Sequence, residues 1–172
     1  MKWREEMSVV NASREVEAPV SRVWATLADF GGIHRFNASV DRSPINEGTP
    51  PSGVGSERTC HLYDGNRIQE RVVESVEEEK ISIEIFETSM PLKSGLGVFT
   101  LVPTANGSTR VTVSMSYVVK YGPVGKLMDV LMVKRMLGSA MSRLLAGLDH
   151  YVTTGETIGN GWKPDEAARH AA

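Results

Sequence analysis

Residues 56–73 read SERTCHLYDGNRIQERVV, and the predicted fold and candidate site both depend on this stretch. Residues 56–63 and 67–73 have the composition of two strands. Asp64-Gly65-Asn66 lies between them, and all three residues are common in turns with positive φ. The stretch therefore predicts a β-hairpin.

Pairing Leu62 with Ile68 across this turn puts alternate residues of both strands on one face. That face is the more apolar one, so it is predicted to point inward. Its members are Arg58, Cys60, Leu62, Ile68, Glu70 and Val72.

Arg58 and Glu70 stand out because charges are rarely buried without a partner or a wet cavity. One interpretation is a register slip, or strand ends at which both charges reach solvent. The other is a polar patch inside a ligand cavity, and the rest of the chain favours it. With Arg58 diagonal to Glu70, an ion pair or a shared water lies within reach.

Composition narrows the class of protein. The 172 residues suit one domain, and the formal net charge of -2 gives no electrostatic case for nucleic acid. No basic run marks a membrane surface. A single cysteine excludes an internal disulfide, and the histidines lack metal-ligand spacing, so no metal or cofactor is predicted. Without a signal peptide or a membrane span, the expected location is cytoplasmic.

The remaining chain alternates short elements with turns. A helix is expected after Pro19, with apolar residues at helical spacing, followed by a short helical turn at 33–36. Asn106-Gly107 is a strong hairpin signal. The other predicted strands cover residues 8–17, 39–45, 81–86, 96–102 and 110–119.

Pairing through Asn106-Gly107 gives that hairpin two different faces. One is apolar and is predicted to pack inward (the dry face), and the other is polar and is predicted to face solvent (the wet face). The wet face contains Thr112, Ser114 and Ser116. The dry face is predicted to contain Leu96, Val98, Thr100, Val102, Val111, Val113, Met115 and Tyr117.

The last large element is a long helix that starts near Pro123. Its first half, residues 127–133, is apolar nearly all round, which suggests a covered segment or a mouth closed by a ligand or partner. Residues 1–155 are expected to form one domain, and residues 156–172 a loosely ordered tail in which Trp162 is a candidate anchor. The apolar stripe of the helix consists of Val130, Val133, Leu137, Met141, Leu144, Leu148 and Tyr151.

The order of these elements resembles the polyketide cyclase/dehydrase branch of the START and birch-pollen-allergen-like (SRPBCC) superfamily. The resemblance spans roughly residues 8–155. It implies the helix-grip fold, an α+β architecture in which a curved antiparallel sheet of six to seven strands wraps around a long C-terminal helix, with two short helices after the first strand. The stretches that carry it are residues 17–24, 29–32, 53–58, 64–66, 69–71, 89–92 and 122–127.

Members of this superfamily bind lipids, plant hormones, flavonoids or quinones, or act on polyketide chains, so function depends on the cavity lining. The superfamily's plant hormone receptors have a similar Glu-Arg pair after their gate loop, with the Glu turned into the cavity. Glu70 matches that Glu, and residues 63–66 match the gate loop in position. The receptors' gate sequence is absent, so hormone signalling is not implied.

Two functions follow as hypotheses. The first is a carrier or sensor of a small hydrophobic molecule that is lipid-like, aromatic or polyketide-like. The aliphatic members of its predicted lining equally suit a solid core. The predicted ligand-binding residues are Arg58, Cys60, Leu62, Ile68, Glu70, Val72, Ile83, Val98, Val113, Met115, Tyr117, Leu137, Met141 and Leu144.

The second hypothesis is a cyclase or dehydratase that acts on a β-keto chain in the same cavity. Glu70 would be the base, with Arg58 or Tyr117 as the donor to the enolate oxygen. Burial favours Glu70 as a base, whereas a neighbouring Arg58 opposes it. A protein-interacting role or a homodimer is suggested only by the apolar first half of the last helix.

Overall fold

A computed structural model describes residues 7–164 of the chain. Seven strands in this part form one antiparallel sheet in the order β1-β7-β6-β5-β4-β3-β2. The arrangement confirms the predicted α+β architecture. The strands are β1 (Ser8–Val16), β2 (Val40–Arg42), β3 (Glu57–Leu62), β4 (Arg67–Val76), β5 (Lys80–Thr88), β6 (Leu92–Pro103) and β7 (Thr109–Val119).

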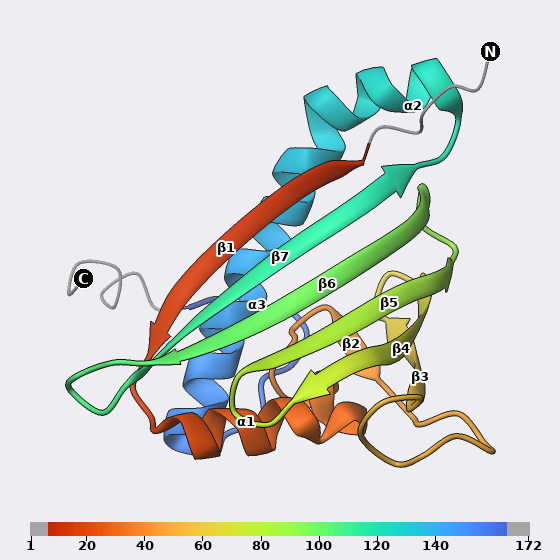
Figure 1. Cartoon of the computed structure of the whole chain (residues 1–172). Helices are drawn as coiled ribbons and strands as arrows, with labels where there is room; N and C mark the ends of the chain where they lie inside the picture. Colours follow the sequence, from red (N-terminus) through yellow and green to blue (C-terminus); the bar gives the residue numbers. More distant parts are fainter. Residues whose placement is uncertain (1–6, 165–172) are drawn as a thin grey trace.

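Five helical segments accompany the sheet in the described residues. The long helix α3 lies across one face of the curved sheet (Figure 1). At one end of the molecule lies α1, whereas α2 lies beyond the ends of β1 and β7 at the other (Figure 1). The segments are α1 (Val20–Ala28), the 3-10 helix η1 (Phe30–Arg35), α2 (Gly122–Met128), the π-helix η2 (Asp129–Val133) and α3 (Lys134–Thr154).

The predicted last helix is therefore one helical run interrupted by a π-helical turn. Tyr121, with φ of 73°, precedes the run, and Gly155, with φ of 77°, ends it. Of the predicted stripe, Met141 and Tyr151 are half-buried, and the side chain of Val130 is outside the described part. The remaining stripe residues, Val133, Leu137, Leu144 and Leu148, are buried.

Two clusters of buried side chains hold α3 against the sheet. The first involves α1, η1 and the second half of α3, with Phe30, Phe99 and Leu148 among its members. The second lies nearer to α2 and includes Val10, Met115 and Leu137. The candidate site described below lies between them.

Gly147 explains how α3 approaches the segment after η1. A Cβ at this position would lie 2.1 Å from the Phe36 carbonyl oxygen. Glycine weakens an isolated helix, but close packing against the Phe36 backbone requires it at this position.

The predicted dry face of β6 is wrong by one residue. A two-residue turn at Asn106-Gly107 would pair Val102 with Val111, but the structure pairs Leu101 with Val111. Residues 104–108 form the connection, closed by a 2.9 Å hydrogen bond from Thr104 N to Ser108 O. The inward residues of β6 are consequently Gly95, Gly97, Phe99 and Leu101, and Leu96, Val98, Thr100 and Val102 lie on the outer face.

The β3–β4 hairpin differs from its predicted register by two residues. Cys60 lies opposite Ile68, and Arg58 lies directly opposite Glu70 rather than diagonal to it. Asn66 already pairs with the end of β3, because its carbonyl accepts a 2.9 Å bond from Leu62 N. A shift by two residues exchanges partners but preserves the faces, so the predicted inward set is unchanged.

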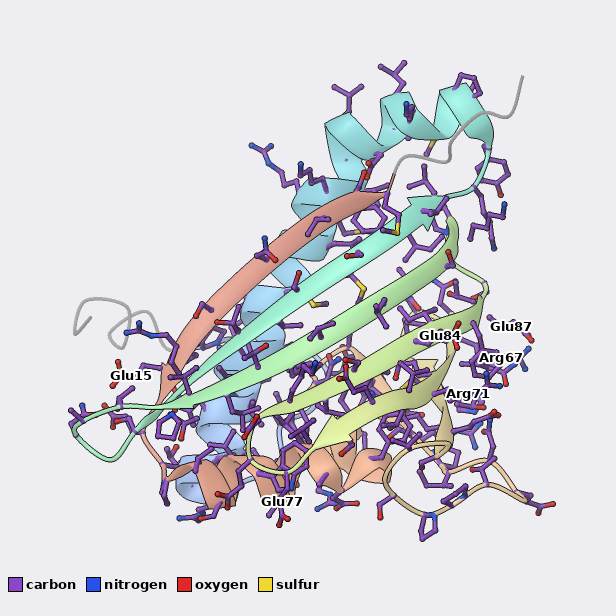
Figure 2. All side chains as sticks on the ribbon, in the orientation of Figure 1. Glu15, Arg67, Arg71, Glu77, Glu84 and Glu87 are labelled. Carbon is purple, nitrogen blue, oxygen red and sulfur yellow. The ribbon has the colours of Figure 1, made fainter. Side chains whose placement is uncertain are left out.

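The outer face of the sheet carries charged side chains. Figure 2 shows Arg67, Arg71, Glu84 and Glu87 close together at one end of β4 and β5, on the right of the view. Arg71 lies 2.6 Å from the Glu57 carboxylate and 3.6 Å from that of Glu84. No helix between residues 7 and 164 has both the length and the apolar character needed to cross a membrane.

Part of the predicted tail is described. Ile158 is buried, and its N–H donates a 3.0 Å hydrogen bond to the Arg35 carbonyl. The Trp162 ring lies 5.4 Å from that of His150, measured between centroids. Residues 165–172 lie outside the described part of the chain.

Candidate functional site

A cavity of about 270 Å³ lies between the inward face of the sheet and the first half of α3. Its wall is largely apolar. The strands contribute side chains such as Ile83 and Met115, and α3 contributes Leu137, Met141 and Leu144. Residues of both core clusters line the cavity.

Glycine on β6 leaves part of this space open. Gly97 lines the cavity, and a Cβ there would make only ordinary contacts, 3.4 Å from Met115 Cε and 3.9 Å from the Ile83 carbonyl oxygen. Gly95, the next inward residue, is more crowded, since its Cβ would lie 3.3 Å from Ile85 Cδ1. Glycine inside a strand gives up side-chain packing, and here it widens the interior.

Arg58 and Glu70 form an ion pair in the cavity wall. Arg58 Nε donates a 2.6 Å bond to Glu70 Oε2, and Arg58 Nη1 donates a 2.6 Å bond to the Phe30 carbonyl. The guanidinium also lies 4.0 Å from the centroid of the Phe30 ring. The pair thus connects β3 and β4 to η1.

Cys60 completes the polar cluster. Its thiol donates to the same Glu70 oxygen, with a sulfur–oxygen distance of 3.4 Å. Burial, and then the neighbouring Glu70 carboxylate, raise the pKa of Cys60 above its usual range. Burial lowers the pKa of Arg58 but the Glu70 carboxylate raises it, and the net direction is upward. The cluster therefore holds a charged pair beside an unreactive thiol.

Tyr117 belongs to a different polar cluster, near η2. Its hydroxyl donates a 2.5 Å bond to Asp129 Oδ1, and the Ser8 hydroxyl donates to Asp129 Oδ2. Burial, and then the bond to Asp129, raise the pKa of Tyr117. The phenol satisfies a buried carboxylate and is not aimed into the cavity, so its expected role as a ligand donor is not supported.

A second, more polar hollow of about 430 Å³ adjoins the cavity and shares Ser39, Asp64 and Arg143 with it. Trp162 and Lys163 form part of its wall. Asp64 accepts bonds from the Asn66 backbone and side chain, and these hydrogen bonds lower its pKa. We call this second hollow the antechamber.

Residues 7–153 match the family model described as polyketide cyclase / dehydrase and lipid transport. The chain belongs to this family. No curated protein matches the chain.

Solved structures share the fold at low sequence identity. A protein from Thermus thermophilus has a TM-score of 0.72 at 20% identity, with 86% of this chain and 99% of that chain covered. A START superfamily protein from Mycobacterium smegmatis has a TM-score of 0.70 at 20% identity, with coverage of 84% and 97%. Norcoclaurine synthase from Thalictrum flavum has a TM-score of 0.65 at 15% identity, with coverage of 87% and 88%. At these identities the likeness shows the helix-grip fold alone.

Most of the residues predicted as ligand-binding from the sequence lie together around the cavity. Val72 is fully buried in the first core cluster, Val98 lies on the outer face, and Tyr117 bonds Asp129, so these three do not line it. Those that do are Arg58, Cys60, Leu62, Ile68, Glu70, Ile83, Val113, Met115, Leu137, Met141 and Leu144.

Sequence reasoning missed lining residues from η1 and the segment after it, from the strands and their connections, and from α3. The inward glycines of β6 were a signal, because small residues at alternate positions mark a space in the sheet. No group of three His, Cys, Asp or Glu residues that could hold a metal ion occurs within residues 7–164. The missed lining residues are Ile33, Asn37, Ser39, Val40, Asp64, Ile85, Met90, Leu92, Gly97, Phe99, Met136, Ala140 and Arg143.

Proposed function

We propose that the chain binds a small hydrophobic molecule in the cavity under α3 and acts as its carrier or sensor. The observation that carries this proposal is an apolar interior space of about 270 Å³, kept open in part by Gly97, with a polar cluster in its wall. Concave apolar sites with a few convergent polar groups are typical of small-molecule binding. Membership of a family whose description includes lipid transport is consistent with it.

The polar cluster suggests the chemistry of the ligand. Arg58 and Cys60 both donate to Glu70 Oε2, so a donor on the ligand would meet Oε1. A lipid-like, aromatic or polyketide-like molecule that carries a hydroxyl group fits this wall. The antechamber, whose wall is more polar, offers a second place for the polar end of the ligand.

Catalysis on a β-keto chain has weaker support. A base must take a proton from the substrate, but the Glu70 carboxylate is already held in an ion pair with Arg58, and only Oε1 is left for that role. Tyr117, the expected donor to an enolate oxygen, bonds Asp129 instead. Ligand binding is therefore better supported than catalysis.

The test is displacement of a fluorescent apolar dye, 1-anilinonaphthalene-8-sulfonate, by decanoate and by 2-naphthol. We expect both competitors to displace the dye. Gly97→Leu places a side chain in the cavity and should abolish displacement, whereas Val98→Leu adds a methylene on the outer face and should not.

Ala140→Phe narrows the cavity at α3 without changing the sheet and serves as a second variant if Gly97→Leu unfolds. Melting curves establish that each variant is folded. Unchanged displacement in both folded variants, or failure of every competitor with the unmodified protein, would overturn the proposal.

A further inference from the structure

The helical run α2–η2 and the first turn of α3 expose a group of large apolar side chains. We call this group the apolar tip. Val124, Leu127, Leu131 and Met132 are each 64–66% exposed. Contiguous exposed apolar surface usually marks an interaction site. The full set is Tyr121, Val124, Leu127, Met128, Leu131, Met132 and Met136.

The tip is exposed because of its position. In Figure 1, α2 lies beyond the ends of β1 and β7, so no strand is opposite its outward face. Gly125 packs tightly against the segment that leads into α2, since a Cβ there would lie 1.9 Å from the Lys120 carbonyl oxygen. The buried Asp129 anchors η2 through Tyr117 and Ser8. The tip is therefore anchored through Asp129, and residues 7–164 leave its outward side chains exposed.

Within residues 118–148, which include the tip, the exposed charged side chains are all cationic. Residues 118–148 contain a single acidic residue, the buried Asp129. Lys126, Lys134 and Arg135 are all exposed. Lys134 and Arg135 follow Leu131 by three and four residues, so they lie within about one helical turn of it. An apolar surface with a cationic border matches an anionic lipid surface, in which acyl chains lie beneath negative headgroups.

The tip also adjoins the candidate site. Met136 is an exposed member of the tip and lines the cavity, together with Leu137 on the next position of α3. Met136 thus belongs both to the apolar surface of the tip and to the wall of the cavity. A partner that supplies apolar molecules and docks on the tip would therefore lie next to the cavity wall at Met136.

From these observations we propose that the apolar tip docks onto an anionic lipid bilayer surface. The chain lies on the membrane without crossing it, with the tip side chains among the upper acyl chains and the cations at the headgroups. A second copy of the chain is a poorer occupant, because tip-to-tip pairing around a two-fold axis would bring both sets of cations together. If the cavity binds a hydrophobic ligand, as proposed above, docking would let that ligand pass between bilayer and cavity.

The experiment is co-sedimentation with vesicles of phosphatidylcholine alone or mixed with phosphatidylglycerol. We expect binding to the mixed vesicles that weakens with added salt and is much weaker with phosphatidylcholine alone. The double variant Leu127→Glu/Leu131→Glu should reduce partition about tenfold or more. Its matched control, Val54→Glu/Val102→Glu, changes two exposed apolar residues away from the tip and should bind normally.

Charge reversal tests the cationic border separately. Lys134→Glu/Arg135→Glu should also reduce partition about tenfold or more, and the control Arg22→Glu/Arg42→Glu, which makes the same change at exposed residues of α1 and β2, should reduce it less. All these positions are exposed, so melting curves should remain close to that of the unmodified protein.

Equal binding by the tip variants and their controls, no preference for phosphatidylglycerol, or a stable dimer that loses its partner in the tip variants would overturn the docking proposal. Gly97→Leu separates this proposal from ligand binding, because it should leave vesicle partition unchanged. Vesicle binding without dye displacement would contradict the ligand proposal only, and the reverse result would contradict docking only.

Discussion

The β3–β4 hairpin carries two ion pairs at adjacent cross-strand positions, one on each face of the sheet. Arg58 lies opposite Glu70 on the inward face, and Glu57 lies opposite Arg71 on the outer face. In both pairs the shortest nitrogen–oxygen distance is 2.6 Å. The side chains of the inner pair are 4% and 13% exposed, against 41% and 21% for Arg71 and Glu57. The two pairs thus have the same nitrogen–oxygen distance and neighbouring positions on the strands, but they differ in how far they are exposed to solvent.

The difference shows that contact distance alone does not determine the energetic importance of an ion pair. Arg71 has alternatives, since it also contacts Glu84 and the Phe86 ring and reaches water. Arg58 has been removed from water and depends on Glu70 for its counter-charge. Losing one partner should therefore have unequal consequences on the two faces.

Glu70→Gln is expected to have the largest effect. It leaves the Arg58 guanidinium buried without a counter-charge, which should lower the free energy of unfolding by about 3–5 kcal/mol. Urea denaturation followed by circular dichroism measures this loss. A loss below about 1 kcal/mol would mean that water in the cavity solvates Arg58, and Glu70 would then be free to serve mainly as a ligand anchor.

A double variant separates the charge from the shape of the site. Arg58→Met/Glu70→Leu removes both charges while filling similar volumes, so it should recover most of the stability lost in Glu70→Gln. If the double variant is as unstable as the single one, the Arg58 bond to the Phe30 carbonyl contributes more than the charge pair does.

The inner cluster should also make stability depend on alkaline pH. The pKa of Cys60 is raised in the folded protein, first by burial and then by Glu70, whereas the unfolded thiol ionises near its usual value of about 8.5. The stabilising contribution is present below that value and is lost as pH rises above it, because the unfolded chain then releases a proton that the folded protein retains. The slope should approach about 1.4 kcal/mol per pH unit.

Urea midpoints measured between about pH 7.5 and 9.5 check this expectation. Cys60→Ala serves as the control and should remove the slope, although it also changes packing. Tyr117, whose pKa is raised as well, contributes in the same direction only above about pH 10. A slope that persists in Cys60→Ala would assign the effect to another group.

The same hairpins show what the sequence could predict. Alternation correctly predicted the faces of β3 and β4, because the register differed by two residues and the side-chain period is two. The one-residue difference at β6 exchanged the faces of Val98 and Phe99, and it concealed the inward position of Gly97. Turn composition indicated both hairpins but did not fix the length of either connection, and that length determines the register.

Cavity and tip were harder to predict for a related reason. Aliphatic residues such as Leu144 look the same in sequence whether they fill a core or line a space, and only the positions of neighbouring backbones distinguish the two. The apolar run at residues 127–133 was recognised, but its exposure depends on how far the helix extends beyond β1 and β7. Both features depend on the relative placement of distant segments.

The smallest effect is expected from Glu57→Gln, the outer counterpart of Glu70→Gln. The substitution is chemically identical and affects an ion pair of the same length in the neighbouring cross-strand position. Since Arg71 remains partly in water and keeps its contact with Glu84, the loss should not exceed about 1 kcal/mol and should shrink further with added salt. Urea denaturation of both variants in the same buffers gives the comparison directly. Equal losses would show that burial does not distinguish the two pairs, and the energetic contribution of Arg58 would then have to come from its contacts with Phe30.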